Sequence, residues 1–347
     1  MDEFVYVGLP TRVVLGVGAL DKVPDEIDLL GIEKVLLIAT KAVRDDADLL
    51  EIALKDRFAG RIDDVRQHVP IERAEAARNK AKEVDAQGIV AIGGGSAIGL
   101  AKAIALTTRL PIVAVPTTYA GSEMTPVWGL TAEGTKTTGS SLDVLPKTVV
   151  YDPLLSRRLP LKVTAASVAN ALAHCAEATW TPKANPITDV TAVEGVRALS
   201  EGLRAATTEP TDLEARSNLL YGACLAGSTL AQAGTSLHHK LCHLLGGTYD
   251  LPHAETHAAV LPQVTRVKAL DAPRAKVRLE AALETDDLAT GLYDLFTTAQ
   301  VPTSLKELGL TEGQAREAAD KFAPDDPEVL DILIRAWAGQ RPEGAAR

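Results

Sequence analysis

Residues 88–106 read GIVAIGGGSAIGLAKAIAL, an apolar run that leads through a glycine turn into a second apolar run. This order predicts a strand, a tight turn and a helix. At such a turn the backbone amides can approach a ligand closely, and the helix dipole favours an anion. We therefore expect Gly93, Gly94, Gly95 and Ser96 to bind a pyrophosphate. The alternative is a turn that only packs the helix on its sheet, because the glycine spacing differs from the common dinucleotide fingerprint.

The N-terminal half repeats this alternation of β-rich and helical runs. RVVLG begins at residue 12, KVLLIAT at residue 34 and PIVAVPT at residue 111, with helical stretches between them. This rhythm predicts an α/β domain over residues 1–155, with a parallel sheet covered by helices on both faces. From residue 161 onward the β signal fades and long Ala/Leu-rich stretches follow, so residues 156–347 are predicted to form an all-helical domain. Pro153 and Pro160 interrupt regular structure near the boundary.

Composition narrows the class of protein. The 347 residues are 46% hydrophobic and carry a net charge of −10, with no run of Lys or Arg. A large core and small-molecule partners are expected, whereas nucleic acid and membrane partners are not. The three cysteines lie in apolar helical patterns without CxxC spacing and read as reduced thiols. The acidic N-terminus and the lack of an apolar run of about 18 residues lead us to expect a cytoplasmic protein.

A second loop, PTTYAGSE at residues 116–123, follows the apolar strand PIVAV. Ligands in α/β folds bind beyond the carboxyl ends of parallel strands. The hydroxyl groups of Thr117, Thr118 and Ser122 could therefore bind ribose, phosphate or the nicotinamide amide. Together with the glycine loop, they predict a nucleotide site.

Histidines are concentrated in the C-terminal half. Five of the seven lie between His238 and His257, and His174 lies in an upstream helical stretch. On helices, His239 and His243 share one face, as do Asn170 and His174, and His253 follows a Gly-Gly turn and a proline. The set resembles a divalent-metal site, but the position expected to supply a carboxylate is the neutral Asn170. His238 and His257 are expected to flank this cluster at the surface or behind it.

The motifs GGGSAIGLAKAIAL, PTTYAGSEMTP, LPKTVVYDP, NALAHCAEA and HHKLCHLLGGTYDLPH resemble the iron-containing alcohol dehydrogenase superfamily over nearly the whole chain. The resemblance implies a Rossmann-like N-terminal domain, a helical C-terminal domain of the dehydroquinate synthase-like architecture, a cleft between them, and commonly a homodimer. It assigns the pyrophosphate and the nicotinamide side to the two loops above and another part of the nucleotide to Lys147. It matches His174, His239 and His253 to metal-ligand positions, and His243 to a histidine near the nicotinamide.

Departures from the family pattern point to one branch. Asn170 and Gly99 stand where metal-dependent members place aspartates, and PTTYAGSE is shortened. The loss of the two aspartates and the shortened loop are similar to what the maleylacetate reductases have at these positions, and their activity is not thought to need a metal. The resemblance thus implies reduction of the enone double bond of maleylacetate to 3-oxoadipate in aromatic-compound degradation. Lys41 ends KVLLIAT where members strict for NAD often have an acidic residue, so NADPH is expected to serve as well as NADH.

The expected reaction assigns a role to each residue of the histidine set. His243 and His253 are expected to bind or protonate near the reacting enone, and His174 and His239 to orient the substrate as part of the catalytic set. Asn170, His253 and Ser122 are the expected substrate contacts. Three alternatives remain: a metal-dependent alcohol or polyol dehydrogenase with three histidines and water on Zn²⁺ or Fe²⁺, a lyase of the dehydroquinate synthase type, and a non-catalytic NAD-binding sensor.

Overall fold

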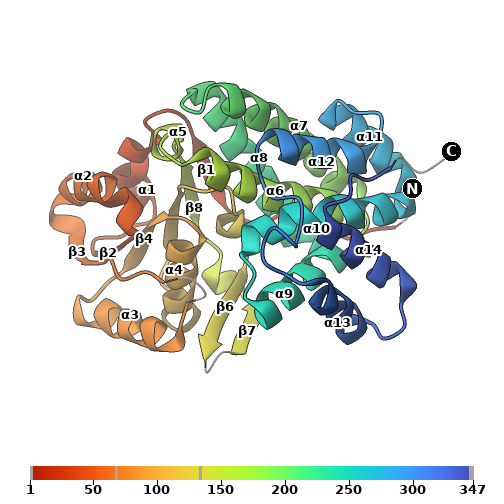
Figure 1. Cartoon of the computed structure of the whole chain (residues 1–347). Helices are drawn as coiled ribbons and strands as arrows, with labels where there is room; N and C mark the ends of the chain where they lie inside the picture. Colours follow the sequence, from red (N-terminus) through yellow and green to blue (C-terminus); the bar gives the residue numbers. More distant parts are fainter. Residues whose placement is uncertain (1–2, 67–68, 133–134, 344–347) are drawn as a thin grey trace. The chain divides into compact units, whose positions relative to one another are not determined.

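A computed structural model describes residues 3–66, 69–132 and 135–343. The chain divides into two compact units, Gly8–Leu159 and Pro160–Arg347, and the segment up to Val7 is grouped with the second. The division falls after Leu159, and the domains expected from the sequence were residues 1–155 and 156–347. We call them the α/β unit and the helical unit (Figure 1).

The α/β unit is built on a six-stranded sheet whose neighbouring strands are all parallel. The strand order is β1-β8-β5-β4-β2-β3. Their bounds are β1 (Arg12–Leu15), β2 (Val35–Ala39), β3 (Phe58–Ile62), β4 (Gly88–Gly93), β5 (Ile112–Pro116) and β8 (Thr148–Tyr151). The predicted parallel α/β architecture is confirmed.

Helices cover both faces of this sheet (Figure 1). Alternate residues of a strand point to opposite faces, so Val35, Leu37 and Ala39 share one core cluster with α1 and α2, whereas Leu36 and Ile38 point the other way. On that second face α4 packs against β2, β4 and β5, and α3 packs against α4. Burial on both faces explains why the central strands are continuously apolar. The helices are α1 (Val23–Leu29), α2 (Arg44–Leu54), α3 (Ile71–Glu83), α4 (Gly95–Thr108) and α5 (Pro153–Ser156).

An antiparallel hairpin of β6 (Val127–Ala132) and β7 (Thr135–Ser140) was not predicted from the sequence. In β6 the side chains are half-buried or exposed. The hairpin therefore lacks the buried apolar pattern by which a strand is recognised.

The helical unit is organised around α6 (Leu161–Ala178). Every residue from Thr164 to Ala178 is buried, and α6 packs against α7, α8, α9 and α10. A helix that is buried on all sides lies at the centre of its unit, and most of the α6 side chains are apolar, as this position requires. The others are α7 (Pro186–Thr208), α8 (Leu213–Ala233), α9 (Leu237–Tyr249), α10 (His253–Lys268), α11 (Pro273–Leu283), α12 (Leu288–Thr298), α13 (Glu312–Phe322) and α14 (Pro327–Ala338).

Within the described ranges, none of the helices combines the length and the hydrophobicity that crossing a lipid bilayer requires.

Asp152, which directly follows β8, holds the chain there to the segment that follows β1. Its buried carboxylate accepts hydrogen bonds from the backbone amides of Gly18 (3.1 Å), Leu20 (3.0 Å) and Leu154 (3.0 Å). Asp152→Ala leaves these amides without their acceptor, so we expect the free energy of unfolding to fall by about 2–3 kcal/mol in urea titrations. Asp152→Asn keeps one carbonyl oxygen and should lose less. A loss below about 0.5 kcal/mol for the alanine variant would contradict this role.

Candidate functional site

The glycine loop lies at the carboxyl end of β4, where it approaches its neighbours too closely for other side chains. Gly93 has a φ of +147°, and a Cβ there would lie 2.8 Å from Cγ2 of Thr40. A Cβ on Gly94 would lie 3.1 Å from Cγ2 of Thr118. Helix α4 begins directly afterwards at Gly95, so its first amides border this loop. The arrangement has the close backbone and the helix N-terminus that a pyrophosphate site needs.

Several predicted nucleotide residues gather beside this loop. The Thr117 amide donates to the carbonyl oxygen of Gly93 at 3.0 Å, and the Thr40 amide donates to that of Ile92 at 3.3 Å. Lys41, which follows Thr40, is exposed and begins a short 3-10 helix. Gly93–Ser96, Thr117, Thr118 and Lys41 are therefore brought to the carboxyl edge of the sheet, and Ser122 lies in the loop that continues from Thr118.

Lys147 does not join them. It precedes β8, its amide donates to Ile112 at the start of β5 (2.9 Å), and its carbonyl accepts from Arg12 at the start of β1 (3.0 Å). In a parallel sheet these positions form the amino edge, opposite the glycine loop. The structure thus separates Lys147 from the other residues assigned to the nucleotide.

The predicted histidines do come together in the helical unit. The rings of His174 on α6 and His239 on α9 stack with centroids 4.8 Å apart. The His239 and His243 centroids are 6.2 Å apart, and His243 stacks on His253 of α10 at 5.9 Å. Asn170 lies one turn before His174 on α6 and is buried. The five side chains thus form one group, here named the histidine cluster.

Glu177, which the sequence analysis did not single out, anchors this cluster. Its fully buried carboxylate accepts from the backbone amides of His238 (2.8 Å) and His239 (3.4 Å) and lies 2.5 Å from Nδ1 of His239. The ring hydrogen of neutral His239 is therefore held at Nδ1, and Nε2 presents a lone pair. The signal was present in the sequence, because Glu177 lies three residues after His174, close to one turn of helix.

His238 and His257 were expected at the surface or behind the cluster. Both are fully buried, so of these two positions the structure excludes the surface. Nε2 of His238 lies 2.8 Å from Nδ1 of His257, and Nε2 of His257 lies 3.3 Å from Nε2 of His253. A chain of ring nitrogens therefore runs behind the cluster from His238 to His253. The i, i+4 spacing of His253 and His257 on one helix could have indicated that these two rings lie next to each other.

Burial keeps these imidazoles neutral. It lowers the pKa of His174, His239 and His257 well below the usual value, and neighbouring imidazoles lower it further. Burial also lowers the pKa of His238 to about 3, although Glu177 acts in the opposite direction. Desolvation raises the pKa of the Glu177 carboxyl. These four imidazoles are therefore uncharged donors and acceptors beside one buried acid.

Three buried atoms of the cluster have no hydrogen-bond partner: Oδ1 of Asn170, Nδ1 of His174 and Nε2 of His239. Since most buried polar groups are satisfied, atoms of this kind mark where a polar molecule or ion binds. A carboxylate behind an imidazole, as in Glu177 and His239, also occurs in metal sites. The group to test first is thus the divalent metal that the family resemblance implies.

The residues do not fit that metal. Among the described residues, His238, His239 and His257 form the only trio of His, Cys, Asp or Glu whose ligand atoms all lie within 4.8 Å of one another, so His174, His239 and His253 do not converge in this way. In that trio, His238 and His257 already share a hydrogen bond. Asn170 adds no negative charge. A cation held by His174, His239 and His253 would lack both converging ligands and the anionic ligand that such sites normally provide.

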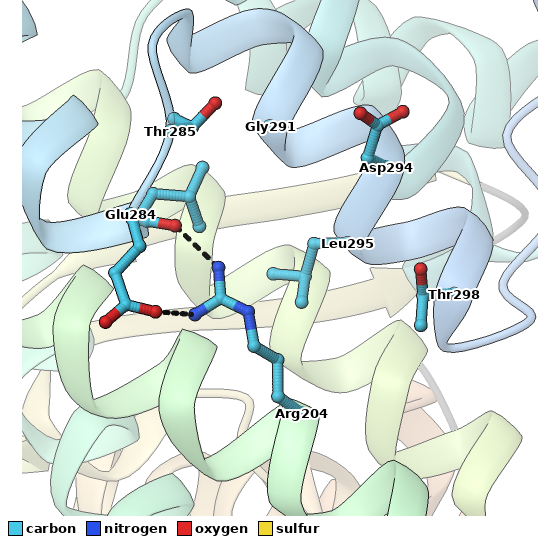
Figure 2. A pocket seen from close by; sticks show the side chains of 8 residues that line it. Arg204, Glu284, Thr285, Gly291, Asp294, Leu295 and Thr298 are labelled. Carbon is cyan, nitrogen blue, oxygen red and sulfur yellow. Dashed lines mark hydrogen bonds and ion pairs between the residues drawn. The ribbon is translucent and has the colours of Figure 1, made fainter.

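A pocket of about 260 Å³ lies elsewhere in the helical unit, between α7, α12 and the residues after α11 (Figure 2). Arg204 in its wall donates to Glu284 (3.3 Å) and to the carbonyl oxygen of Leu283 (2.5 Å). Its charge is already paired at the surface, and none of the predicted site residues lines this pocket. It is not the candidate site.

Glu177→Gln tests the anchor of the cluster. The amide replaces one carboxylate oxygen with an NH₂ group, which must then face a backbone or ring N–H donor of α9. We expect the free energy of unfolding to fall by about 2–3 kcal/mol, measured by thermal and urea denaturation. Glu194→Gln, which removes a half-exposed ion pair with Arg197, is the matched control and should cost under about 1 kcal/mol. Equal effects of the two substitutions would count against an anchoring role.

Both units of the chain match known proteins. The family model of the iron-containing alcohol dehydrogenases matches residues 10–153, and that of the C-terminal region of the same family matches residues 164–329. Maleylacetate reductase 1 of Rhodococcus opacus is 43% identical, covering 98% of each chain. Maleylacetate reductase of Sphingobium indicum is 44% identical, covering 98% of this chain and 99% of the relative.

A solved structure of a relative has the same fold as this chain. The crystal structure of maleylacetate reductase from Rhizobium sp. strain MTP-10005 is 40% identical, with a TM-score of 0.95, and the match covers 99% of this chain and 100% of that one. The resemblance found in the sequence is thereby confirmed. The chain belongs to the iron-containing alcohol dehydrogenase family of oxidoreductases, in the part of it that includes these maleylacetate reductases.

Proposed function

We propose that this protein uses NADH or NADPH to reduce the enone double bond of maleylacetate to 3-oxoadipate, without a metal. The names of its relatives support the substrate. The observation that carries the metal-free reaction is the donor set of the histidine cluster: imidazoles and one amide, with the Glu177 carboxylate already engaged by α9.

The chemistry suits such a cluster. A nicotinamide cofactor bound at Gly93–Ser96, Thr117 and Thr118 would supply a hydride for the carbon β to the ketone. The electron pair of the double bond would move toward the ketone oxygen, and the α-carbon would take up a proton. The developing enolate needs hydrogen-bond donors, which neutral imidazole N–H groups can supply, and a proton donor, which we assign to His243 or His253. One NAD(P)H and one proton are consumed for each 3-oxoadipate formed, so the reaction balances without a further reactant.

Individual roles follow from position. We assign His243 and His253 to the reacting enone, and His174 and His239 to orientation of the substrate, with Glu177 fixing the ring hydrogen of His239. Asn170, His253 and Ser122 are the proposed substrate contacts. The Asn170 amide can donate to a substrate carboxylate, which an aspartate at that position would repel.

The cofactor is assigned to the carboxyl edge of the α/β unit. The pyrophosphate is assigned to Gly93–Ser96, and the nicotinamide side to Thr117, Thr118 and Ser122. Lys41 is exposed beside Thr40 and would not repel the 2′-phosphate of NADPH. Use of both NADH and NADPH is proposed for this reason.

We also propose that the protein forms a homodimer and works in the cytoplasm. Strand β1 lies at one edge of the sheet and exposes Val13 and Leu15, a surface that pairing with a second copy would cover, and this supports a homodimer. The three cysteines are free and buried, which is usual for proteins of the reducing cytoplasm.

The first experiment is an activity assay on EDTA-dialysed protein. We expect rapid oxidation of NADH and of NADPH with maleylacetate, and no increase of more than about twofold on adding Fe²⁺ or Zn²⁺. Simple alcohols with NAD⁺ and either metal form the comparison arm and should show little turnover. Activity that returns only with metal, and above all activity on alcohols, would replace the proposal with a metal-dependent alcohol dehydrogenase. Binding of NADH without any turnover would favour a sensor.

Asn170→Asp tests the neutral amide. A carboxylate would repel the dianionic substrate and supply the missing anionic ligand, so KM for maleylacetate should rise about tenfold and added Zn²⁺ should be retained after dialysis. Asn170→Ala is the control, because it removes the amide without adding charge and should not retain Zn²⁺. An unchanged KM together with unchanged metal content in Asn170→Asp would refute the role given to Asn170.

A further inference from the structure

Lys102 is a fully buried cation in the α/β unit that the proposed reaction does not use. It lies on α4, the helix that begins at the glycine loop, and its side chain is 1% exposed. Its Nζ contacts oxygen atoms on the loop that follows β5: the carbonyl oxygens of Ser122 (2.6 Å), Thr125 (2.8 Å) and Val127 (2.8 Å), and Oγ1 of Thr125 at 3.0 Å. Oγ of Ser122 is farther away, at 3.4 Å.

The three short contacts to carbonyl oxygens identify the state of this side chain. A carbonyl oxygen only accepts hydrogen bonds, so three of them require three N–H donors. The ammonium has three, whereas a neutral amine has two and would leave one carbonyl oxygen facing its lone pair. Although burial lowers the pKa of Lys102 to about 7, the geometry fits the charged form. Hydrogen bonds from a charged donor are also stronger than neutral ones.

The group that can compensate this buried charge is the carboxylate of Glu123, whose pKa burial raises to about 7, although Lys102 acts in the opposite direction. This residue is 1% exposed, lies in the same loop and interacts electrostatically with Lys102. Its Oε1 accepts from the hydroxyl group of Tyr151 on β8 at 2.8 Å. The loop is therefore held at one point by α4 and at another by the sheet.

This network joins the two halves of the proposed cofactor site. Helix α4 carries Gly95 and Ser96 at its start, and the loop held by Lys102 carries Thr118 and Ser122. Gly94 already approaches Thr118 so closely that a Cβ would lie 3.1 Å from it. The position of the hydroxyl groups relative to the glycine loop thus depends on what ties the loop to α4, and Lys102 makes five of those contacts.

We propose that Lys102 is a positioning residue for the nicotinamide cofactor: its ammonium fixes the loop of Thr118 and Ser122 against the helix of the pyrophosphate site. The inference rests on the proposed function, because it assumes that these loops bind NAD(P)H. Lys102 does not touch the cofactor in this account. It acts through the three carbonyl oxygens that it gathers.

The test is a series of full-length variants in which the donors at this position are removed stepwise. Lys102→Met keeps the length and removes all N–H donors, and Lys102→Gln retains two. The Kd for NADH is measured by fluorescence titration, and kcat and KM are measured with maleylacetate. We expect Kd to rise at least about tenfold for Lys102→Met and by less for Lys102→Gln, while kcat at saturating NADH falls less than about threefold. The KM for maleylacetate should change less than about twofold.

The matched control is Arg216→Met in the helical unit. Arg216 is also a fully buried cation that binds loop oxygens, donating to the carbonyl oxygen of Pro210 (2.7 and 2.9 Å) and to Oγ1 of Thr164 (2.7 Å). Its loss should lower the thermal unfolding midpoint, as loss of Lys102 does, and leave the Kd for NADH within about twofold of the wild-type value.

The outcomes separate a positioning role of Lys102 from general stability and from a failure of the proposed function. A folded Lys102→Met variant with wild-type Kd for NADH overturns the inference and leaves the proposed function standing. Wild-type protein that does not bind NADH overturns both. If Lys102→Met does not fold, Lys102→Gln supplies the same comparison. Equal losses of NADH affinity in Lys102→Met and Arg216→Met would mean that Lys102 contributes only general stability, which also overturns the inference.

Discussion

Helix α6 is buried along almost its whole length, and the polar side chains in its C-terminal half must therefore find partners inside the protein. Glu177 finds them in the backbone of α9, whereas His174 stacks on His239 and keeps Nδ1 without a hydrogen-bond partner. Desolvation then keeps the imidazoles neutral. The position, tautomer and charge of the cluster all follow from placing polar groups on the most buried helix of the unit.

The α/β unit meets a related constraint at the carboxyl edge of its sheet. There the backbone of β4 comes so close to Thr40 and Thr118 that glycine is required, and this leaves amides rather than side chains next to the start of α4. Behind that edge, the ionisable side chains of Lys102 and Glu123 are both buried. In both units, a few buried polar contacts between distant segments fix the residues to which chemistry is assigned.

Most of the fold could be predicted because its buried elements carry a strong pattern. The strands β2, β4 and β5 are continuously apolar, and α8, LEARSNLLYGACLAGSTLAQA, is one of the long Ala/Leu-rich stretches after residue 161. The hairpin β6–β7 was missed because its side chains are partly exposed. In the site, the histidines were predicted from their helical spacing, but the partners that hold them, the amides of α9 for Glu177 and the His257 ring for His238, are contacts between different helices that spacing does not give. Lys147 was assigned from a motif, and that motif runs from the amino edge of the sheet along β8.

The bond from Glu177 to α9 also has a consequence for how the protein can change. Ser236, at the N-cap of α9, makes no capping hydrogen bond with its own side chain, and the amides of the first turn are satisfied by a carboxylate about 60 residues upstream. The start of this helix is thus specified by a distant segment rather than locally. Sequence drift at α6 and at the α9 N-terminus should then be correlated, and grafting the histidine segment into another scaffold would fail unless its acid were carried along.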